Sequence, residues 1–145
     1  MRRHKKDPKP VLVLLSRDTE LIATVKHSVR PDWTLVSRDI DELPGLIREP
    51  NVRLVVFDDE SVDALDRGWA LAEILRCAAH ASIIYVAGQH DHDNERLARV
   101  RGVLFYTSKP LIETDVTLLL GRLLRTADGK PDLRVGPPST GLRRS

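Results

Sequence analysis

The chain has 145 residues, of which 41% are hydrophobic and 30% are charged. This composition is typical of a single soluble globular domain and excludes a fibrous or largely disordered protein. No apolar run approaches the roughly 18 residues that span a membrane, and the single cysteine, Cys77, excludes an internal disulfide. We therefore expect a cytoplasmic protein with no membrane association.

Charge is distributed unevenly along the chain. Residues 1–10 carry five Lys and Arg against one Asp, and residues 126–145 carry four against two, although the formal net charge is only +2. The region between the ends is therefore acidic, which disfavours nucleic acid as a partner despite the basic ends. We expect a basic N-terminal arm at 1–10, one domain at 11–125, and a flexible tail rich in Pro, Gly and Arg at 126–145.

Strands and helices are expected to alternate five times within 11–125. Short apolar runs typical of strands occupy residues 11–15, 33–36, 52–58, 82–87 and 103–107. Helix-type periodicity or capping follows each run, at residues 18–30, 39–49, 63–79, 95–101 and 111–125. Pro44 and Gly45 reduce the expected regularity of the second helix. This alternation predicts an α/β fold with one parallel sheet covered on both faces.

The strand Leu54-Val55-Val56-Phe57-Asp58 runs directly into two further acids. In an open α/β sheet the carboxyl ends of the strands line the ligand crevice, so Asp58 is expected at a functional site. Three other strand ends should lie beside it, namely Ser16-Arg17-Asp18, Ala87-Gly88 and Lys109-Pro110.

These strand ends resemble those of the receiver domain of two-component response regulators, over nearly all of 11–125. The resemblance rests on the strand that ends at Asp58, on Phe105-Tyr106-Thr107-Ser108-Lys109-Pro110, and on the separation of Asp58 and Lys109 by about fifty residues. It implies a flavodoxin-like (βα)5 doubly wound parallel sheet with strand order 2-1-3-4-5.

The resemblance also implies roles for individual residues. Asp58 would be the phosphoacceptor for a histidine kinase, Lys109 would contact the phosphoryl oxygens, and Tyr106 would be the aromatic switch residue. Pro110 is a candidate for a cis peptide bond, because X–Pro bonds adopt cis at little cost. The second switch position is Ala87, where the family usually has Ser or Thr; alanine cannot donate the hydrogen bond of that hydroxyl.

The largest departure from the family pattern follows the first strand. Receivers normally place two Mg²⁺-binding acids there, whereas this chain has Ser16 and Arg17, with Asp18 one place further on. A guanidinium at this place would either neutralise Asp58 and repel Mg²⁺ or turn out into solvent. We therefore expect phosphorylation of Asp58 to be weak or absent, and Mg²⁺ to bind only if Asp58 is functional; no other cofactor is expected.

Two further clusters of ligand-type residues are expected to be structural. Asp59 and Glu60 are predicted to begin a solvated loop. His90-Asp91-His92-Asp93 is predicted to be a helix-capping loop, because adjacent residues cannot all face one metal and no distant ligand is evident. The sequence thus predicts no metal site.

Together these features predict a stand-alone, atypical receiver that is not an enzyme and acts in phosphorelay signal transduction through protein contacts. Its partner would be a signalling protein such as a histidine kinase, and the chain would be a monomer or homodimer. The fourth helix has only Leu97 and Val100 to bury, which suits an element that a partner covers.

Four alternatives remain open at this point. The first is a conventional receiver phosphorylated on Asp58. The second is a small α/β phosphatase, because Asp58-Asp59-Glu60 faintly resembles the haloacid-dehalogenase nucleophile motif. The others are an FMN-binding protein, disfavoured by the lack of a glycine-rich phosphate loop, and a nucleic-acid-binding protein.

Overall fold

The computed structural model describes residues 9–48 and 51–123. Its centre is a sheet of parallel strands in the order β2-β1-β3-β4-β5. The strands are β1 (Val11–Leu15), β2 (Thr34–Arg38), β3 (Val52–Asp58), β4 (Ser82–Ala87) and β5 (Phe105–Ser108). The predicted doubly wound fold and its strand order are confirmed.

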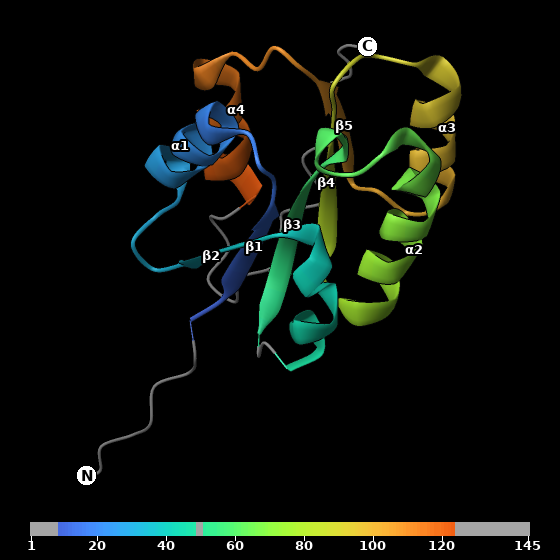
Figure 1. Cartoon of the computed structure of the whole chain (residues 1–145). Helices are drawn as coiled ribbons and strands as arrows, with labels where there is room; N and C mark the ends of the chain where they lie inside the picture. Colours follow the sequence, from blue (N-terminus) through green and yellow to red (C-terminus); the bar gives the residue numbers. More distant parts are fainter. Residues whose placement is uncertain (1–8, 49–50, 124–145) are drawn as a thin grey trace, which may run out of the picture.

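Helices cover both faces of the sheet (Figure 1). Helices α1 (Thr19–Ser28) and α4 (Glu113–Leu123) pack together on one face. The other face carries α2 (Arg67–Cys77), α3 (His92–Val100) and the 3₁₀ segment η1 (Ile40–Arg48). Two short 3₁₀ turns, η2 (Asp59–Ser61) and η3 (Ala64–Asp66), connect β3 to α2. The second predicted helix is thus a 3₁₀ segment, and Pro44 within it lacks the N–H that an α-helix would use.

The apolar runs of the central strands are explained by burial on both faces. Val13, Leu15 and Phe57 belong to the core under α2 and η1, whereas Leu12 and Leu14 belong to the core under α1 and α4. Successive side chains of a strand point to opposite faces, so a strand covered on both sides needs apolar residues at every position.

Strand β3 is the middle strand of the sheet, and its position brings the predicted strand ends together. Leu15 lies opposite Phe57, and Asp58 lies opposite Val86. Asp58 is therefore one residue beyond the end of the β1 pairing and next to the end of β4. Lys109 follows β5 directly, and its N–H donates to the Ala87 carbonyl at 2.8 Å.

The fourth predicted helix differs from expectation in its start and its buried face. Helix α3 begins at His92 rather than near residue 95, because the Asp91 side chain accepts the N–H groups of residues 93 and 94. Asp91 thus caps the helix as predicted, whereas His92 and Asp93, predicted to lie in the loop, belong to α3. Leu97 and Val100, expected to be the buried residues, are 58% and 78% exposed, and the small Ala98 is buried instead. Close packing of the helix backbone on the sheet leaves the longer side chains outside.

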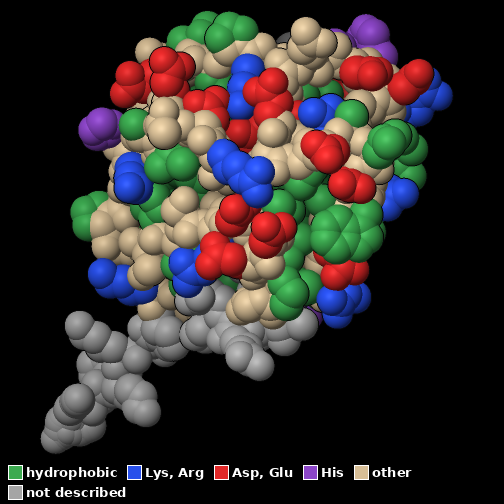
Figure 2. Space-filling view, viewed as in Figure 1, with side chains coloured by type: hydrophobic (Ala, Val, Ile, Leu, Met, Phe, Trp, Pro, Cys, Tyr) green, Lys and Arg blue, Asp and Glu red, His purple; other side chains and the backbone are tan. Residues whose placement is uncertain are grey.

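The face of the molecule drawn in Figure 2 carries acidic and basic side chains interspersed with apolar ones. Within the part of the chain that the structure describes, no helix has the length and apolarity needed to cross a membrane. The predicted basic arm, apart from residues 9 and 10, and the predicted tail lie outside the described residues.

Candidate functional site

The Asp58 carboxylate is buried at the carboxyl edge of the sheet and is bonded through both oxygens. Its side chain is only 1% exposed. Ser16 Oγ donates to Asp58 Oδ2 at 2.7 Å, and Lys109 Nζ donates to the same oxygen at 2.9 Å. The N–H of Glu60 donates to Asp58 Oδ1 at 3.0 Å. Asp58 therefore uses both carboxylate oxygens as hydrogen-bond acceptors, for two side-chain donors and one backbone donor.

Lys109 is the cation that the acidic side chains of the site share. Its Nζ lies 2.9 Å from Asp58 Oδ2, 2.9 Å from Asp18 Oδ2 and 2.8 Å from Glu60 Oε1. Burial lowers the pKa of Lys109, but its hydrogen bonds to Asp18, Glu60 and Asp58 outweigh burial and raise that pKa above its usual range. One fixed ammonium therefore joins three carboxylates that come from the ends of β1 and β3.

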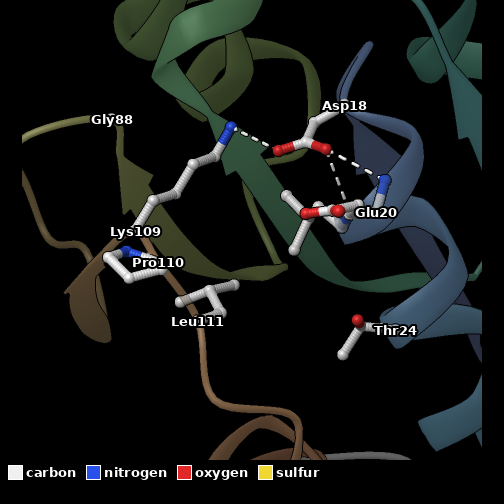
Figure 3. A pocket seen from close by; sticks show the side chains of 8 residues that line it. Asp18, Glu20, Thr24, Gly88, Lys109, Pro110 and Leu111 are labelled. Carbon is white, nitrogen blue, oxygen red and sulfur yellow. Dashed lines mark hydrogen bonds and ion pairs between the residues drawn. The ribbon is translucent and has the colours of Figure 1, made fainter.

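Asp18 is positioned for this contact by its role at the start of α1. One of its carboxylate oxygens accepts the N–H groups of Glu20 and Leu21, and the other faces Lys109 (Figure 3). The hydrogen bond from Lys109 lowers the pKa of Asp18 below its usual range. Ser16 Oγ also accepts the Asp18 N–H at 3.0 Å, which ties the β1–α1 turn to Asp58.

A shallow cleft of about 340 Å³ opens beside these residues, between α1 and the segment that follows β5. Asp18, Thr24, Lys109 and Pro110 are among the residues that line it (Figure 3). The Lys109–Pro110 peptide bond is cis, as the sequence indicates. A Cβ on Gly88 would collide with the Glu60 side chain, so the absence of a side chain at Gly88 leaves room for Glu60 to reach Lys109.

Arg17 does not contact Asp58. Its Nη2 lies 2.9 Å from Asp39 Oδ1, and its side chain is 59% exposed. The prediction that Arg17 neutralises Asp58 is therefore wrong. The other alternative holds, because Arg17 turns outward and forms an exposed ion pair. The cation that does contact Asp58 is Lys109.

This arrangement predicts that only Ser16, and not Arg17, contributes measurably to stability. Ser16→Ala removes a buried hydrogen bond to a charged acceptor, so we expect the free energy of unfolding to fall by roughly 1.5–3 kcal/mol. Arg17→Ala removes an exposed ion pair, and we expect no measurable change. Urea unfolding of both variants tests this, and a larger loss for Arg17→Ala would place that side chain in the site after all.

Asp59 is not part of a solvated loop, contrary to expectation; it is 1% exposed. Tyr85 Oη donates to Asp59 Oδ2 at 3.0 Å, and the Gly88 N–H donates to Asp59 Oδ1 at 2.9 Å. Arg67 Nη2 lies 3.7 Å from the same carboxylate. Because successive side chains point to opposite sides of an extended chain, Asp58 and Asp59 serve two different hydrogen-bond networks. Glu60, by contrast, is exposed as expected.

The Asp59 network continues to Tyr106. Asn94 Nδ2 donates to Tyr85 Oη at 3.0 Å and to Tyr106 Oη at 3.5 Å. The two tyrosine rings stack with centroids 5.1 Å apart, and Tyr106 is buried. Burial raises the pKa of both tyrosines, which keeps both hydroxyls protonated. Tyr106 is thus linked to the end of β3 through residues that the sequence did not single out.

Ala87 lies at the end of β4 and is fully buried. Its methyl group offers neither a hydrogen-bond donor nor an acceptor at this edge of the sheet. The sequence does contain one indication of the hydrogen-bond network around Tyr85, since a buried tyrosine within the apolar strand β4 needs a polar partner.

Comparisons with known proteins agree with this geometry at the level of the fold. No family model matches the chain, and no curated protein sequence matches it. The signal receiver domain of an HD domain-containing protein from Pseudomonas fluorescens is 22% identical, with a TM-score of 0.66 over 81% of this chain and 96% of that one.

Two other solved structures are similar over comparable lengths. A response regulator from Thermotoga maritima is 13% identical, with a TM-score of 0.68 over 82% of this chain and 100% of that one. The pilus assembly protein CpaE from Caulobacter crescentus is 18% identical, with a TM-score of 0.63 over 79% and 92%. The chain therefore has the fold of response-regulator receiver domains.

Proposed function

We propose that this chain is a receiver-type signalling module that acts by binding a protein partner and does not depend on phosphorylation of Asp58. The observation that carries the proposal is the contact of Lys109 with Asp58, Asp18 and Glu60. A built-in ammonium already neutralises much of the charge of Asp58. The site then needs neither a metal ion nor a phosphoryl group to hold one stable arrangement.

The residues around Asp58 are a poor match for Mg²⁺. This ion requires a near-octahedral set of oxygen ligands, usually with one or two protein carboxylates. Ser16 directs its hydroxyl proton at Asp58, Arg17 faces Asp39, and Asp18 is engaged by the α1 N-terminus and Lys109. Among residues 9–48 and 51–123, only one set of three His, Cys, Asp or Glu side chains has its ligand atoms within 4.8 Å of one another, and that set does not include Asp58. Phosphoryl transfer depends strongly on the charge of a bound metal ion. We therefore expect that a site that binds Mg²⁺ poorly leaves Asp58 unphosphorylated.

The exposed apolar side chains of α3 support action through protein contacts. Leu97 and Val100 are solvent-exposed, and Ile112 at the start of α4 is also exposed. A mainly apolar groove of about 380 Å³, which Ile112 also lines, runs along β5 and α4, with Phe105 and Leu119 among its other lining residues. A partner that covers this face would bury surface that the isolated domain leaves in water.

Incubation with acetyl phosphate and Mg²⁺, followed by intact-mass measurement, tests the proposal. We expect little or no mass increase corresponding to one phosphoryl group, because neither Ser16 nor Arg17 supplies a carboxylate for Mg²⁺. A stoichiometric adduct that is absent from Asp58→Asn would contradict the proposal and favour the runner-up, a conventional receiver phosphorylated by a histidine kinase. Two observations favour the conventional receiver as an alternative: Asp58 and Lys109 are in contact, and Tyr106 is linked to the same edge of the sheet.

A repaired variant makes the same test sharper. Arg17→Asp combined with Ala87→Thr adds the acid and the hydroxyl that the family pattern has, and we expect it to gain Mg²⁺-dependent modification. Arg30→Asp is the matched control, since Arg30 also forms an exposed ion pair, with Asp32. If the repaired variant folds but gains no more than this control, the missing acid and hydroxyl do not explain a silent Asp58.

A further inference from the structure

Three metal-ligand side chains meet where the loop after β4 enters α3. His90, His92 and Glu95 each offer one ligand atom, and these atoms all lie within 4.8 Å of one another. His90 precedes the cap residue Asp91, His92 is the first residue of α3, and Glu95 lies almost one turn further along. Because residues three apart share a helix face, His92 and Glu95 are neighbours, and the loop brings His90 to the same place. Glu95 is the third ligand that adjacent residues alone could not supply.

The geometry points to a binding site for Zn²⁺ or a similar divalent transition metal at His90, His92 and Glu95. Two imidazoles with one carboxylate suit Zn²⁺, Ni²⁺ or Cu²⁺, whereas Mg²⁺ prefers oxygen ligands. Tetrahedral coordination at Zn–N and Zn–O distances of about 2.0–2.2 Å requires ligand atoms roughly 3.4 Å apart. Both histidines are exposed, so small side-chain rotations can bring the three atoms to that spacing. Water would complete the coordination.

The arrangement of His90 and Glu95 prepares them to share a cation. His90 Nε2 lies 2.9 Å from Glu95 Oε1, and a metal ion would replace the proton between these two atoms. The other carboxylate oxygen, Oε2, accepts hydrogen bonds from Arg99 Nε at 2.9 Å and forms an ion pair with Arg99 Nη2 at 2.8 Å. Arg99 thus orients the carboxylate and leaves Oε1 facing the histidines, as outer-shell partners of metal ligands do.

Charge and ring packing at the site are consistent with this role. The Glu95 carboxylate lies between two basic side chains, His90 at 2.9 Å and Arg99 at 2.8 Å. The rings of His90 and His92 meet edge to face at 4.5 Å, and the His90 ring also lies edge to face with Tyr106 at 6.0 Å. His90 therefore has a defined position against the body of the domain.

A metal at this place would add a link between the residue before the α3 cap and the first turn of that helix. It would tie the loop after Gly88, through His90, to the first turn of α3, beside Tyr106. Helix α3 carries the exposed Leu97 and Val100 of the proposed partner face. The site would thus fix the start of that face, by chemistry that is independent of Asp58.

Titration of the untagged chain with ZnCl₂ alone, by calorimetry and by metal analysis after dialysis, tests the proposal. We expect one equivalent of Zn²⁺ to bind with a micromolar dissociation constant. His90→Ala, His92→Ala and Glu95→Gln should each weaken binding about tenfold or more. His27→Ala and His80→Ala are matched controls and should leave binding unchanged, because these exposed histidines lie in α1 and in the turn between α2 and β4.

Three outcomes would overturn the inference. The first is binding of Zn²⁺ only at millimolar concentration, and the second is micromolar binding that persists in the His90→Ala/His92→Ala double variant. The third is micromolar binding that disappears in His4→Ala, a histidine outside the described residues. Titration with Co²⁺ provides a readout that does not depend on stability. The visible absorption of a site with nitrogen and oxygen ligands should appear in the wild type and in the two control variants and be absent from the double variant.

Discussion

Replacement of Lys109 by methionine is expected to lower the free energy of unfolding by roughly 3–5 kcal/mol at neutral pH, the cost of removing one partner from a buried ion pair. Methionine keeps most of the hydrocarbon length but not the charge. Asp58, which is 1% exposed, would lose its cation and remain beside Asp18 and Glu60. Urea unfolding measures the loss. Lys26→Met, at an exposed lysine of α1, is the control, and equal stability of the two variants would show that the ammonium is not needed.

The pH dependence of this variant follows from the directions of the pKa shifts. The pKa of Lys109 is raised, so its contribution is present below the ordinary lysine value of 10.5 and is lost only above the raised pKa. The pKa of Asp18 is lowered, so its contribution is present above 3.8 and is lost as the pH falls through the lowered pKa. Between pH about 5 and about 8 this cluster should therefore stabilise the wild type evenly. Lys109→Met should instead regain stability on acidification, because protonation discharges the crowded carboxylates.

Asp59→Ala is expected to cost roughly 3 kcal/mol of unfolding free energy. It leaves the Tyr85 hydroxyl and the Gly88 N–H without their acceptor and Arg67 without its ion pair. A buried donor without a partner costs about 1–3 kcal/mol, and loss of the charged acceptor adds to this. Asp59→Asn retains one acceptor oxygen and should show a smaller loss.

The matched control for Asp59 is Asp63→Ala, an exposed acid in the segment that follows η2. Its unfolding free energy should stay within about 0.5 kcal/mol of the wild type. Thermal and urea unfolding of the three variants provide the comparison. If Asp59→Ala is no more destabilised than Asp63→Ala, the link from the end of β3 to Tyr106 does not contribute to the free energy of unfolding.

The sheet and its strand order could be predicted because the pattern of each strand reflects its burial. Strands β1, β3 and β4 lie in the interior of the sheet and are apolar at successive positions, so their sequences indicate strands buried on both faces. The contact of Lys109 with Asp58 could also be predicted, since both residues follow parallel strands and must end at the same edge. The predicted bounds of the fifth strand, 103–107, differ from the observed Phe105–Ser108, because Val103 and Leu104 are apolar without being in the strand.

The second network at this edge could not be predicted from the same patterns. Asp58 and Asp59 are adjacent and chemically identical, and only the direction of each side chain separates a site residue from a buried structural acid. The hydrogen-bond partners of the Asp59 side chain, Tyr85 and Gly88, come from β4 and the residue that follows it, at a distance in sequence that no local rule connects. Arg17 shows the same limit, because its direction depends on Asp39 beyond β2.

The claim that Lys109 takes the place of a metal ion beside Asp58 is tested most directly by Mg²⁺ titration followed through backbone amide NMR signals. We expect the amides of residues 16–18 and 58–60 to remain unshifted as Mg²⁺ rises into the millimolar range, whereas Arg17→Asp should gain saturable shifts at the same residues. Saturable shifts of those amides in the wild type, lost in Asp58→Asn, would contradict the claim.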